Sequence, residues 1–255
     1  MPKNVAVAPL VHAHAHNDYE HARPLLDALD NGFCSVEADI HLVDGKLLVA
    51  HDRKDARPDR TLQSLYLDPL RRTARKNGGR VYAKGPVSIT LLIDIKTDAA
   101  PTYAALRQAL AQYKDILTEF RADGTTPRAV TAILSGSRPT VAALAAESPR
   151  YAGYDGRLTD LDAGIAPSVM PLVSQSWSSV STWRGEPNVV ISAEERKRVA
   201  DTVARAHKQG YRIRFWATPD TPAAWRLMRD LDIDLVNTDN LVGLRRFLLS
   251  GKSRP

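Results

Sequence analysis

The feature that most constrains the fold is an alternation, repeated along the whole chain, of short β-branched runs with longer amphipathic stretches. This alternation is typical of βα units around a parallel sheet. Eight extended runs are predicted, near residues 11–15, 35–41, 89–95, 129–134, 151–154, 171–174, 212–217 and 235–237. A (β/α)8 barrel needs roughly 250 residues, and the chain has 255. We therefore predict an α/β fold with one TIM barrel domain over residues 1–255.

Amphipathic stretches between these runs supply the helices of the barrel. They are predicted at residues 23–31, 101–120, 138–146, 193–209, 221–230 and 241–250. Gly32 and Gly210 follow two of them, where a helix C-cap favours glycine. After the fifth run, LTDLDAGIAP makes a poor helix, so the barrel is expected to be irregular there.

The second βα unit is longer than the others. Its strand is followed by GKLLVAHD, a further extended segment, and then by a long stretch at residues 53–86. Barrel active sites lie at the C-terminal ends of the strands, and an insertion after a strand lies on that face. We therefore predict that residues 53–86 are an insertion that forms a lid or a substrate-facing subdomain.

Charge and hydropathy limit the partners. Lys and Arg outnumber Asp and Glu by 35 to 29, a net charge of +6, which favours anionic partners. The densest basic stretch, residues 71–84, has no interleaved aromatic platform for bases, so nucleic acid is not expected. We expect a small-molecule or lipid phosphodiester as substrate, peripheral contact with a membrane, and a monomer.

No apolar window approaches the roughly 18 residues of a membrane-spanning helix, and the histidine-rich start of the chain does not predict a signal peptide. Cys34 is the single cysteine, so no internal disulfide can form. The sequence therefore predicts a soluble protein and leaves two compartments open. These are the cytoplasm, or secretion with a signal peptide that is not part of this chain.

Polar side chains gather where the predicted strands end. The early strands contribute the group that includes His16, Glu37, Asp39, Asp94 and Lys96, and the later strands add Ser135, Asp155, Arg157, Ser174, Trp216, Thr218, Asn237 and Asp239. Packing does not require charge at these positions, so the pattern predicts a catalytic rim. Arg157 is expected to contact the substrate.

Three carboxylates in this rim predict a cation site. Glu37 and Asp39 are two residues apart and face the same side of a strand, where they repel each other unless a cation lies between them. Asp94, on the neighbouring strand, adds a third oxygen ligand. Oxygen ligands suit one Mg²⁺ or Ca²⁺ ion. The alternative is that these acids pair with Arg or Lys in a structural network.

Two histidines and a lysine complete the predicted chemistry. His16 and His51 both follow extended segments, and an imidazole titrates near neutral pH, so the pair can act as general base and general acid. Lys96 is predicted to stabilise charge on the phosphate oxygens. One alternative is a zinc amidohydrolase-like hydrolase with His12 and His14 as ligands. The other is a barrel that binds phospholipid head groups without catalysis.

The segment HAHNDYEHARPLLDALDNGFCSVEADIHLVDGKLLVAHD resembles the phospholipase C-like and glycerophosphodiester phosphodiesterase superfamily, most closely its branch around the altered-inheritance-of-mitochondria protein 6. Thinner matches continue through LLIDIKT, RIRFWAT and DLVNTDNL. The resemblance implies a barrel with one divalent ion on Glu37, Asp39 and Asp94. It also implies that His16 and His51 are the catalytic pair.

Shorter motifs refine this resemblance. The His-Asn pair is similar to that of eukaryotic phosphoinositide phospholipases C and implies Asn17 as a fourth metal ligand. DIKT is similar to a sphingomyelinase D-type motif and implies that Lys96 contacts phosphate, and FWAT implies that Trp216 walls the substrate pocket. The expected function is a metal-dependent phosphoric diester hydrolase acting on a phospholipid-derived or glycerophosphodiester-like substrate. Its nucleophile is water or a substrate hydroxyl, and the hydroxyl gives a cyclic phosphate.

Overall fold

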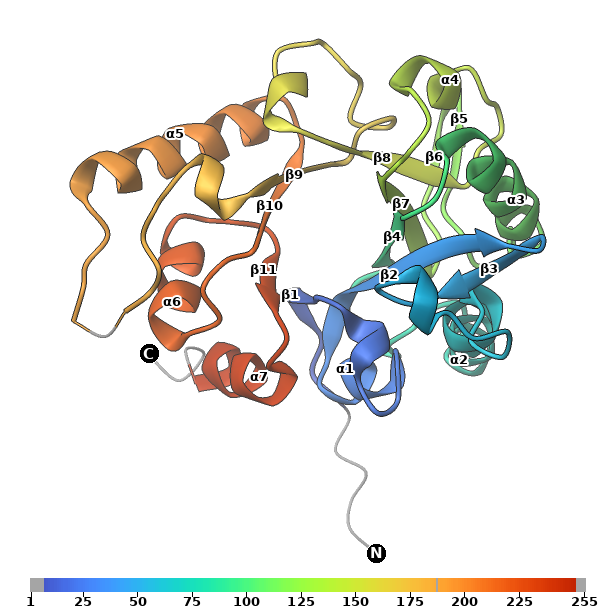
Figure 1. Ribbon diagram of the computed structural model, residues 1–255, viewed down its shortest axis with the longest axis horizontal. Helices are drawn as coiled ribbons and strands as arrows, with labels where there is room; N and C mark the ends of the chain where they lie inside the picture. The colour runs from blue at the N-terminus through green and yellow to red at the C-terminus, as the bar shows by residue number, and fades with distance from the viewer. Residues whose placement is uncertain (1–6, 187, 251–255) are drawn as a thin grey trace, which may run out of the picture.

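The computed structural model describes residues 7–186 and 188–250, and eight parallel strands form a nearly closed barrel at its centre (Figure 1). The strands are β1 (Leu10–Ala15), β2 (Phe33–Val43), β4 (Ile89–Ile95), β7 (Val130–Gly136), β8 (Ala152–Gly156), β9 (Leu172–Ser176), β10 (Arg212–Trp216) and β11 (Val236–Thr238). β1 pairs with both β2 and β11, and a bridge between Arg214 and Leu235 joins β10 to the segment before β11. The predicted TIM barrel is confirmed.

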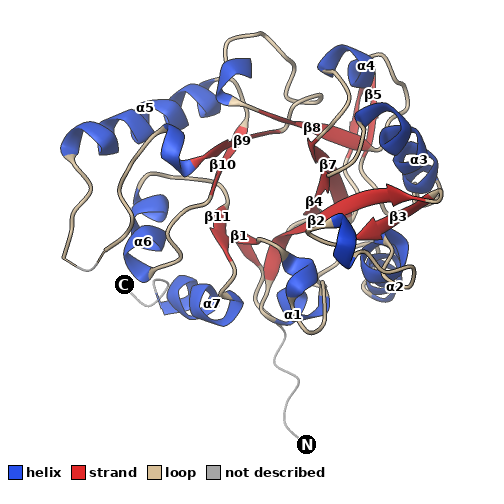
Figure 2. Ribbon diagram, viewed as in Figure 1, coloured by secondary structure: helices blue, strands red, loops and turns tan. Residues whose placement is uncertain are grey.

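Helices surround the barrel on its outside (Figure 2). They are α1 (Leu26–Asp30), α2 (Asp68–Lys76), α3 (Ala99–Ala111), α4 (Val141–Ala145), α5 (Ala193–Lys208), α6 (Pro222–Asp230) and α7 (Leu241–Ser250). Thr140, Ser192 and Thr221 cap the N-termini of α4, α5 and α6, because each side chain accepts a hydrogen bond from a backbone N–H in the first turn. None of the described helices is both long and apolar enough to cross a membrane.

The helix predicted at residues 101–120 is wrong over its last part. α3 ends at Ala111, and the chain turns into β5 (Glu119–Arg121), which pairs with β6 (Gly124–Thr126). The apolar spacing continues through Leu117 and Phe120, but their backbones bridge to Val130 and Arg150 instead. Pairing with distant segments therefore overrides the helical periodicity.

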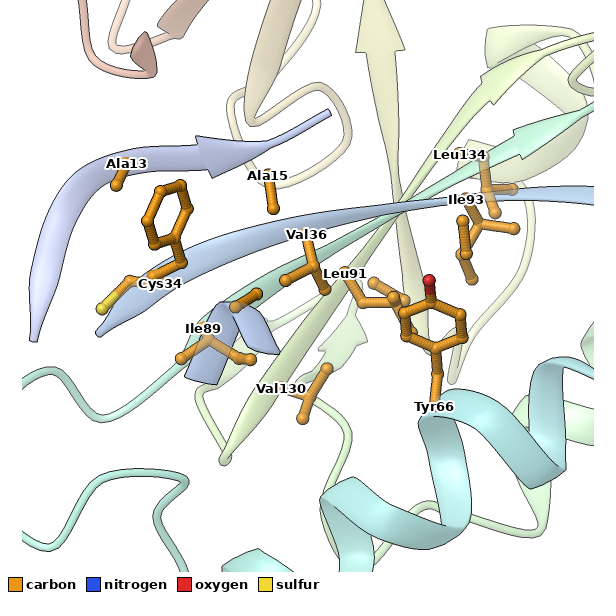
Figure 3. Close-up of a cluster of buried hydrophobic side chains, with 14 of the residues drawn as sticks. Ala13, Ala15, Cys34, Val36, Tyr66, Ile89, Leu91, Ile93, Val130 and Leu134 are labelled. Carbon is orange, nitrogen blue, oxygen red and sulfur yellow. The ribbon is translucent and has the colours of Figure 1, made fainter. Parts of the chain in front are cut away.

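The long second unit packs largely as part of the barrel. β3 (Lys46–Val49) runs antiparallel to β2, and η2 (Arg53–Asp55), η3 (Gln63–Leu67) and α2 follow it. Tyr66, Leu67 and Leu70 are fully buried, and Figure 3 shows Tyr66 on this helical segment facing the strand side chains around Leu91. The helical segment formed by η3 and α2, residues 63–76, takes the place of the second barrel helix. Residues 77–86 return to the opposite mouth, where Pro86 lies beside His12, so they cannot cover the C-terminal face. Closure of residues 53–62, which include Asp55, Arg57 and Arg60 beside His51, as a lid stays a prediction.

Alternation along the strands separates the two sides of the barrel wall. Val36, Leu91, Ile93, Val130 and Leu134 point outward into the layer beneath the helices (Figure 3). A second, small apolar cluster is formed by Leu92, Ile133, Leu172 and Leu235. In the register of the sheet, Leu92 of β4 lies beside Glu37 of β2. Two residues closer to the C-terminal mouth, Asp94 of β4 lies between Asp39 of β2 and Ser135 of β7. The strands thus deliver polar side chains to that mouth.

Candidate active site

A cavity of about 280 Å³ opens at the C-terminal mouth of the barrel. It is lined by His16, Asn17, Glu37, Asp39, His51, Asp94, Lys96, Ser135, Arg157, Arg214 and Trp216. All nine residues proposed from the sequence as catalytic, metal-binding or substrate-binding therefore border one space. A larger cavity, of about 660 Å³, lies outside the barrel beside α3 and is lined by none of them.

The three predicted carboxylates lie together. One oxygen each of Glu37, Asp39 and Asp94 falls within 4.8 Å of the other two. Oε2 of Glu37 is buried and makes no hydrogen bond within the described part of the chain. An unpartnered buried carboxylate oxygen is costly unless a positive group or ion compensates it. The oxygen-only ligand set therefore fits a hard divalent cation.

Two basic side chains approach the same carboxylates. Lys96 Nζ lies 3.0 Å from Asp39 Oδ2 and 3.3 Å from Asp94 Oδ2, and Arg214 Nη1 lies 3.5 Å from Glu37 Oε2. The ion-pair network considered as an alternative is thus present. Two cations do not neutralise three carboxylates, however, so the cluster remains net negative and still attracts an ion.

The cluster perturbs the pKa values of its members. Burial and the nearby Glu37 carboxylate raise the pKa of Asp39 to about 6, and burial raises the pKa of Asp94. Burial alone would raise the pKa of Glu37, but the charge of Arg214 and the nearby His14 imidazole, 3.6 Å away, hold it well below its usual range. Burial thus disfavours the ionised form of both Asp39 and Asp94, and the Glu37 charge adds to this effect at Asp39; a bound cation would favour the ionised forms.

The two predicted catalytic histidines are anchored differently. His16 Nδ1 donates to Asp239 Oδ1 at 2.8 Å, and its Nε2 lies 3.9 Å from Glu37 Oε2. Burial lowers the pKa of His16, but Asp239 and Glu37 raise it above its ordinary value overall. His51 Nδ1 lies 3.4 Å from Asp39 Oδ2. His41, which had no predicted role, donates its Nε2–H to the backbone oxygen of His51 at 3.2 Å.

The sequence analysis missed Tyr19 and Arg214. The Tyr19 hydroxyl lies 2.7 Å from Asp39 Oδ2, 2.8 Å from Asn17 Oδ1 and 3.1 Å from His51 Nδ1. A buried aromatic residue close to strand β1 gives no signal that separates it from the core. Arg214 could have been found, because it precedes Trp216 by two residues and therefore faces the same side of β10.

The residues predicted to contact the substrate, Arg157 and Trp216, also line the cavity. Arg157 Nη1 donates to Asp155 Oδ2 at 2.9 Å, and its Nη2 donates to Ser135 Oγ at 3.3 Å. Trp216 is 39% exposed at the mouth. Ser174 and Asn237, also predicted for the rim, instead contact the guanidinium of Arg214, and Thr218 is not part of the cavity lining.

The structure gives no support to zinc on His12 and His14. His14 is fully buried, with Nδ1 2.7 Å from Ser35 Oγ and Nε2 2.6 Å from Arg214 Nη1, so both ring nitrogens are engaged. Burial, with Arg214 beside it, lowers the pKa of His14 to about 4. His12 lies at the opposite mouth and donates from Nδ1 to the backbone oxygen of Asp234. The two imidazoles do not share an open site.

Gly136 leaves the space that Asp94 occupies. Its φ is 66°, and a Cβ at this position would clash with Asp94 Oδ1 and with the backbone oxygen of Ile95. We expect Gly136→Ala to displace the Asp94 carboxylate and to weaken Mg²⁺ or Ca²⁺ binding about tenfold or more, measured by calorimetric titration. Gly164→Ala is the matched control, because φ there is 68° and nothing lies within 4 Å of the added Cβ. Equal cation affinity in the two variants would contradict this role.

Comparison with known proteins places the chain among phosphodiesterase families. A family model described as AIM6-like phosphodiesterase domain matches residues 4–155, and one for the glycerophosphoryl diester phosphodiesterase family matches residues 212–241. Altered inheritance of mitochondria protein 6 of Eremothecium gossypii is 30% identical over 94% of this chain and 70% of its own length. Its homolog in Arthroderma benhamiae is 28% identical over 89% of this chain and 81% of its own.

Solved structures support the same fold. The match with a glycerophosphodiester phosphodiesterase from Parabacteroides distasonis covers 97% of this chain and 100% of that one, with a TM-score of 0.56 and 16% identity. One from Agrobacterium tumefaciens covers 93% and 99%, with a TM-score of 0.52 and 16% identity. At this level of identity, the likeness establishes the barrel architecture alone.

Proposed function

Because the chain belongs to the AIM6-like phosphodiesterase domain family, we propose that it is a cation-dependent phosphoric diester hydrolase that uses His16 and His51. The observation that best supports this proposal is the meeting of three carboxylates and these two imidazoles in one cavity. Burying three carboxylates side by side in a barrel costs folding free energy, and such clusters of perturbed groups are typical of functional sites.

The two imidazoles divide the proton transfers between them. One removes a proton from the nucleophile, which is water or a neighbouring hydroxyl of the substrate, and the other protonates the leaving oxygen. Asp239 at Nδ1 of His16 and Tyr19 at Nδ1 of His51 engage the far side of each ring. Each imidazole thus has a hydrogen-bond partner at Nδ1, and its Nε2 is the nitrogen that we assign to the substrate.

The charged residues hold and neutralise the phosphate. Glu37, Asp39 and Asp94, with Asn17 as a fourth ligand, would hold Mg²⁺ or Ca²⁺, which when bound acts as a Lewis acid toward a phosphodiester oxygen. Lys96 offers its ammonium group to the phosphate oxygens, where negative charge increases during the reaction. The ion pairs of Lys96 with Asp39 and Asp94 at the cavity support this role.

The cavity suits the polar part of a phosphodiester. Its volume, about 280 Å³, is at the small end of the range for ligand sites. It accepts a phosphate with a compact head group, while long acyl chains would remain outside, next to Trp216. We therefore propose a phospholipid-derived or glycerophosphodiester-like substrate, with Arg157 and Trp216 contacting the group next to the phosphate.

A panel of phosphodiesters tests the proposal. Glycerophosphodiesters, lysophospholipids and diacyl phospholipids are each incubated with Mg²⁺ or Ca²⁺, and the products are identified by phosphorus NMR, which also separates a cyclic from an open phosphate. We expect turnover of at least one class, its loss in a chelator, and its recovery when the cation is added back. Binding of these compounds without any turnover would instead favour a head-group-binding barrel.

A further inference from the structure

One buried hydroxyl connects the proposed cation site to one of the proposed catalytic histidines. Tyr19 is 3% exposed, and its hydroxyl contacts Asp39, Asn17 and His51. We propose that Tyr19 is a positioning residue that holds the proton of His51 on Nδ1, turns Nε2 toward the cavity, and links this orientation to the cation ligands. The inference rests on the proposed function for its catalytic consequence, although its structural content can be tested without a substrate.

The hydrogen-bond directions follow from counting protons. A tyrosine hydroxyl has a single hydrogen to donate. Its two nearest acceptors are the Asp39 carboxylate at 2.7 Å and the Asn17 amide oxygen at 2.8 Å. Hydrogen bonds to a charged acceptor are the stronger ones, so the hydrogen is directed mainly to Asp39 and is shared only weakly with Asn17. A tyrosine hydroxyl keeps its hydrogen at neutral pH.

His51 must then be the donor in its contact with Tyr19. Because the hydroxyl hydrogen points to Asp39, the Tyr19 oxygen offers only lone pairs to His51 Nδ1, which lies 3.1 Å away. The Asp39 carboxylate, 3.4 Å from the same nitrogen, adds a weaker electrostatic preference for an N–H there. The partner on one ring nitrogen decides the tautomer of a histidine. Nδ1 therefore carries the proton, and Nε2 of neutral His51 is an acceptor.

The difference in burial explains why this contact matters. The side chain of His51 is 57% exposed, so packing holds its ring weakly. Tyr19 is rigid by comparison, because its ring is in the core and its backbone oxygen accepts a 2.5 Å hydrogen bond from Arg60 Nη2. A fixed partner behind a mobile imidazole lowers the entropy lost on reaching the productive orientation. Tyr19 supplies that fixed partner and at the same time orients Asp39.

The decisive variant is Tyr19→Phe, which removes the hydroxyl and keeps the ring. Tyr82→Phe is the matched control, because Tyr82 is also buried and its hydroxyl donates to the backbone oxygen of Phe33 at 2.7 Å, away from the cavity. Nitrogen-15 NMR reports the tautomer of His51 in the cation-free proteins, and calorimetric titration with Mg²⁺ or Ca²⁺ reports cation affinity. Circular dichroism confirms that each variant is folded.

We expect wild type and Tyr82→Phe to show His51 protonated on Nδ1 and equal cation affinity. In Tyr19→Phe, the His51 tautomer should shift toward Nε2–H, and cation affinity should fall about tenfold, as when other partners of a metal ligand are lost. With a substrate identified, kcat should fall far more than KM rises, because orientation rather than binding is lost.

Two results would overturn the inference. One is a wild-type His51 with its proton on Nε2, which can be read even if Tyr19→Phe does not fold. The other is a folded Tyr19→Phe whose His51 tautomer and cation affinity match those of wild type. Failure of the proposed function looks different: the tautomer and the cation affinity respond to Tyr19→Phe as expected, but wild type hydrolyses no phosphodiester.

Discussion

Asp94→Asn should reduce kcat by roughly a thousandfold, which corresponds to several kcal/mol of lost charge stabilisation in the transition state. The amide keeps the shape of the side chain but removes one of three negative charges that lie within 4.8 Å of one another. Lys96 keeps its other partner, Asp39, at 3.0 Å, so no basic group is left unpaired. Cation affinity, measured by calorimetry in the absence of substrate, should fall with the activity.

Asp234→Asn is the control for this experiment. Asp234 also lies in a strand-end segment of the barrel, but at the opposite mouth, where it accepts hydrogen bonds from His207 and from the backbone of Ile213. This variant should lose stability and keep the wild-type cation affinity. Wild-type cation binding and turnover in Asp94→Asn would show that the carboxylate cluster is a structural ion-pair network.

His16→Ala and His51→Ala should each lower kcat by about a hundredfold to ten-thousandfold, the range in which general acid or base catalysis contributes. Neither imidazole belongs to the carboxylate cluster, so Mg²⁺ or Ca²⁺ should still bind to both variants. Steady-state kinetics on the substrate found in the panel, together with calorimetric titration, separates the two effects. Loss of turnover with retained cation binding is the expected signature.

His12→Ala serves as both control and discriminator. His12 lies at the other mouth of the barrel, bonded to the backbone oxygen of Asp234, and its removal should leave turnover unchanged. If His12→Ala were inactive while His16→Ala remained active, the His16 and His51 assignment would be wrong and the zinc hydrolase would be favoured.

Local patterns were enough to predict most of the barrel. Most strands are marked by a run of apolar and β-branched residues, although β8 (AGYDG) has no β-branched residue, and capped amphipathic stretches between strands mark the helices, so the eight strands were found in order. Errors occurred where distant segments decide the local structure. Residues 112–120 leave the helix because Leu117 and Phe120 bridge to Val130 and Arg150, and α2 was missed inside the long second unit.

The site divides in the same way. By itself, the sequence determined which chemical groups face the barrel interior, because a spacing of two residues on a strand places Glu37 and Asp39 on one side whatever surrounds them. Only the tertiary structure decided which groups touch. Tyr19 between Asp39 and His51, Arg214 beneath Glu37, and the space above Gly136 for Asp94 all depend on how strands align around a closed barrel. That alignment is set by the packing of the whole wall, and no local stretch of sequence contains it.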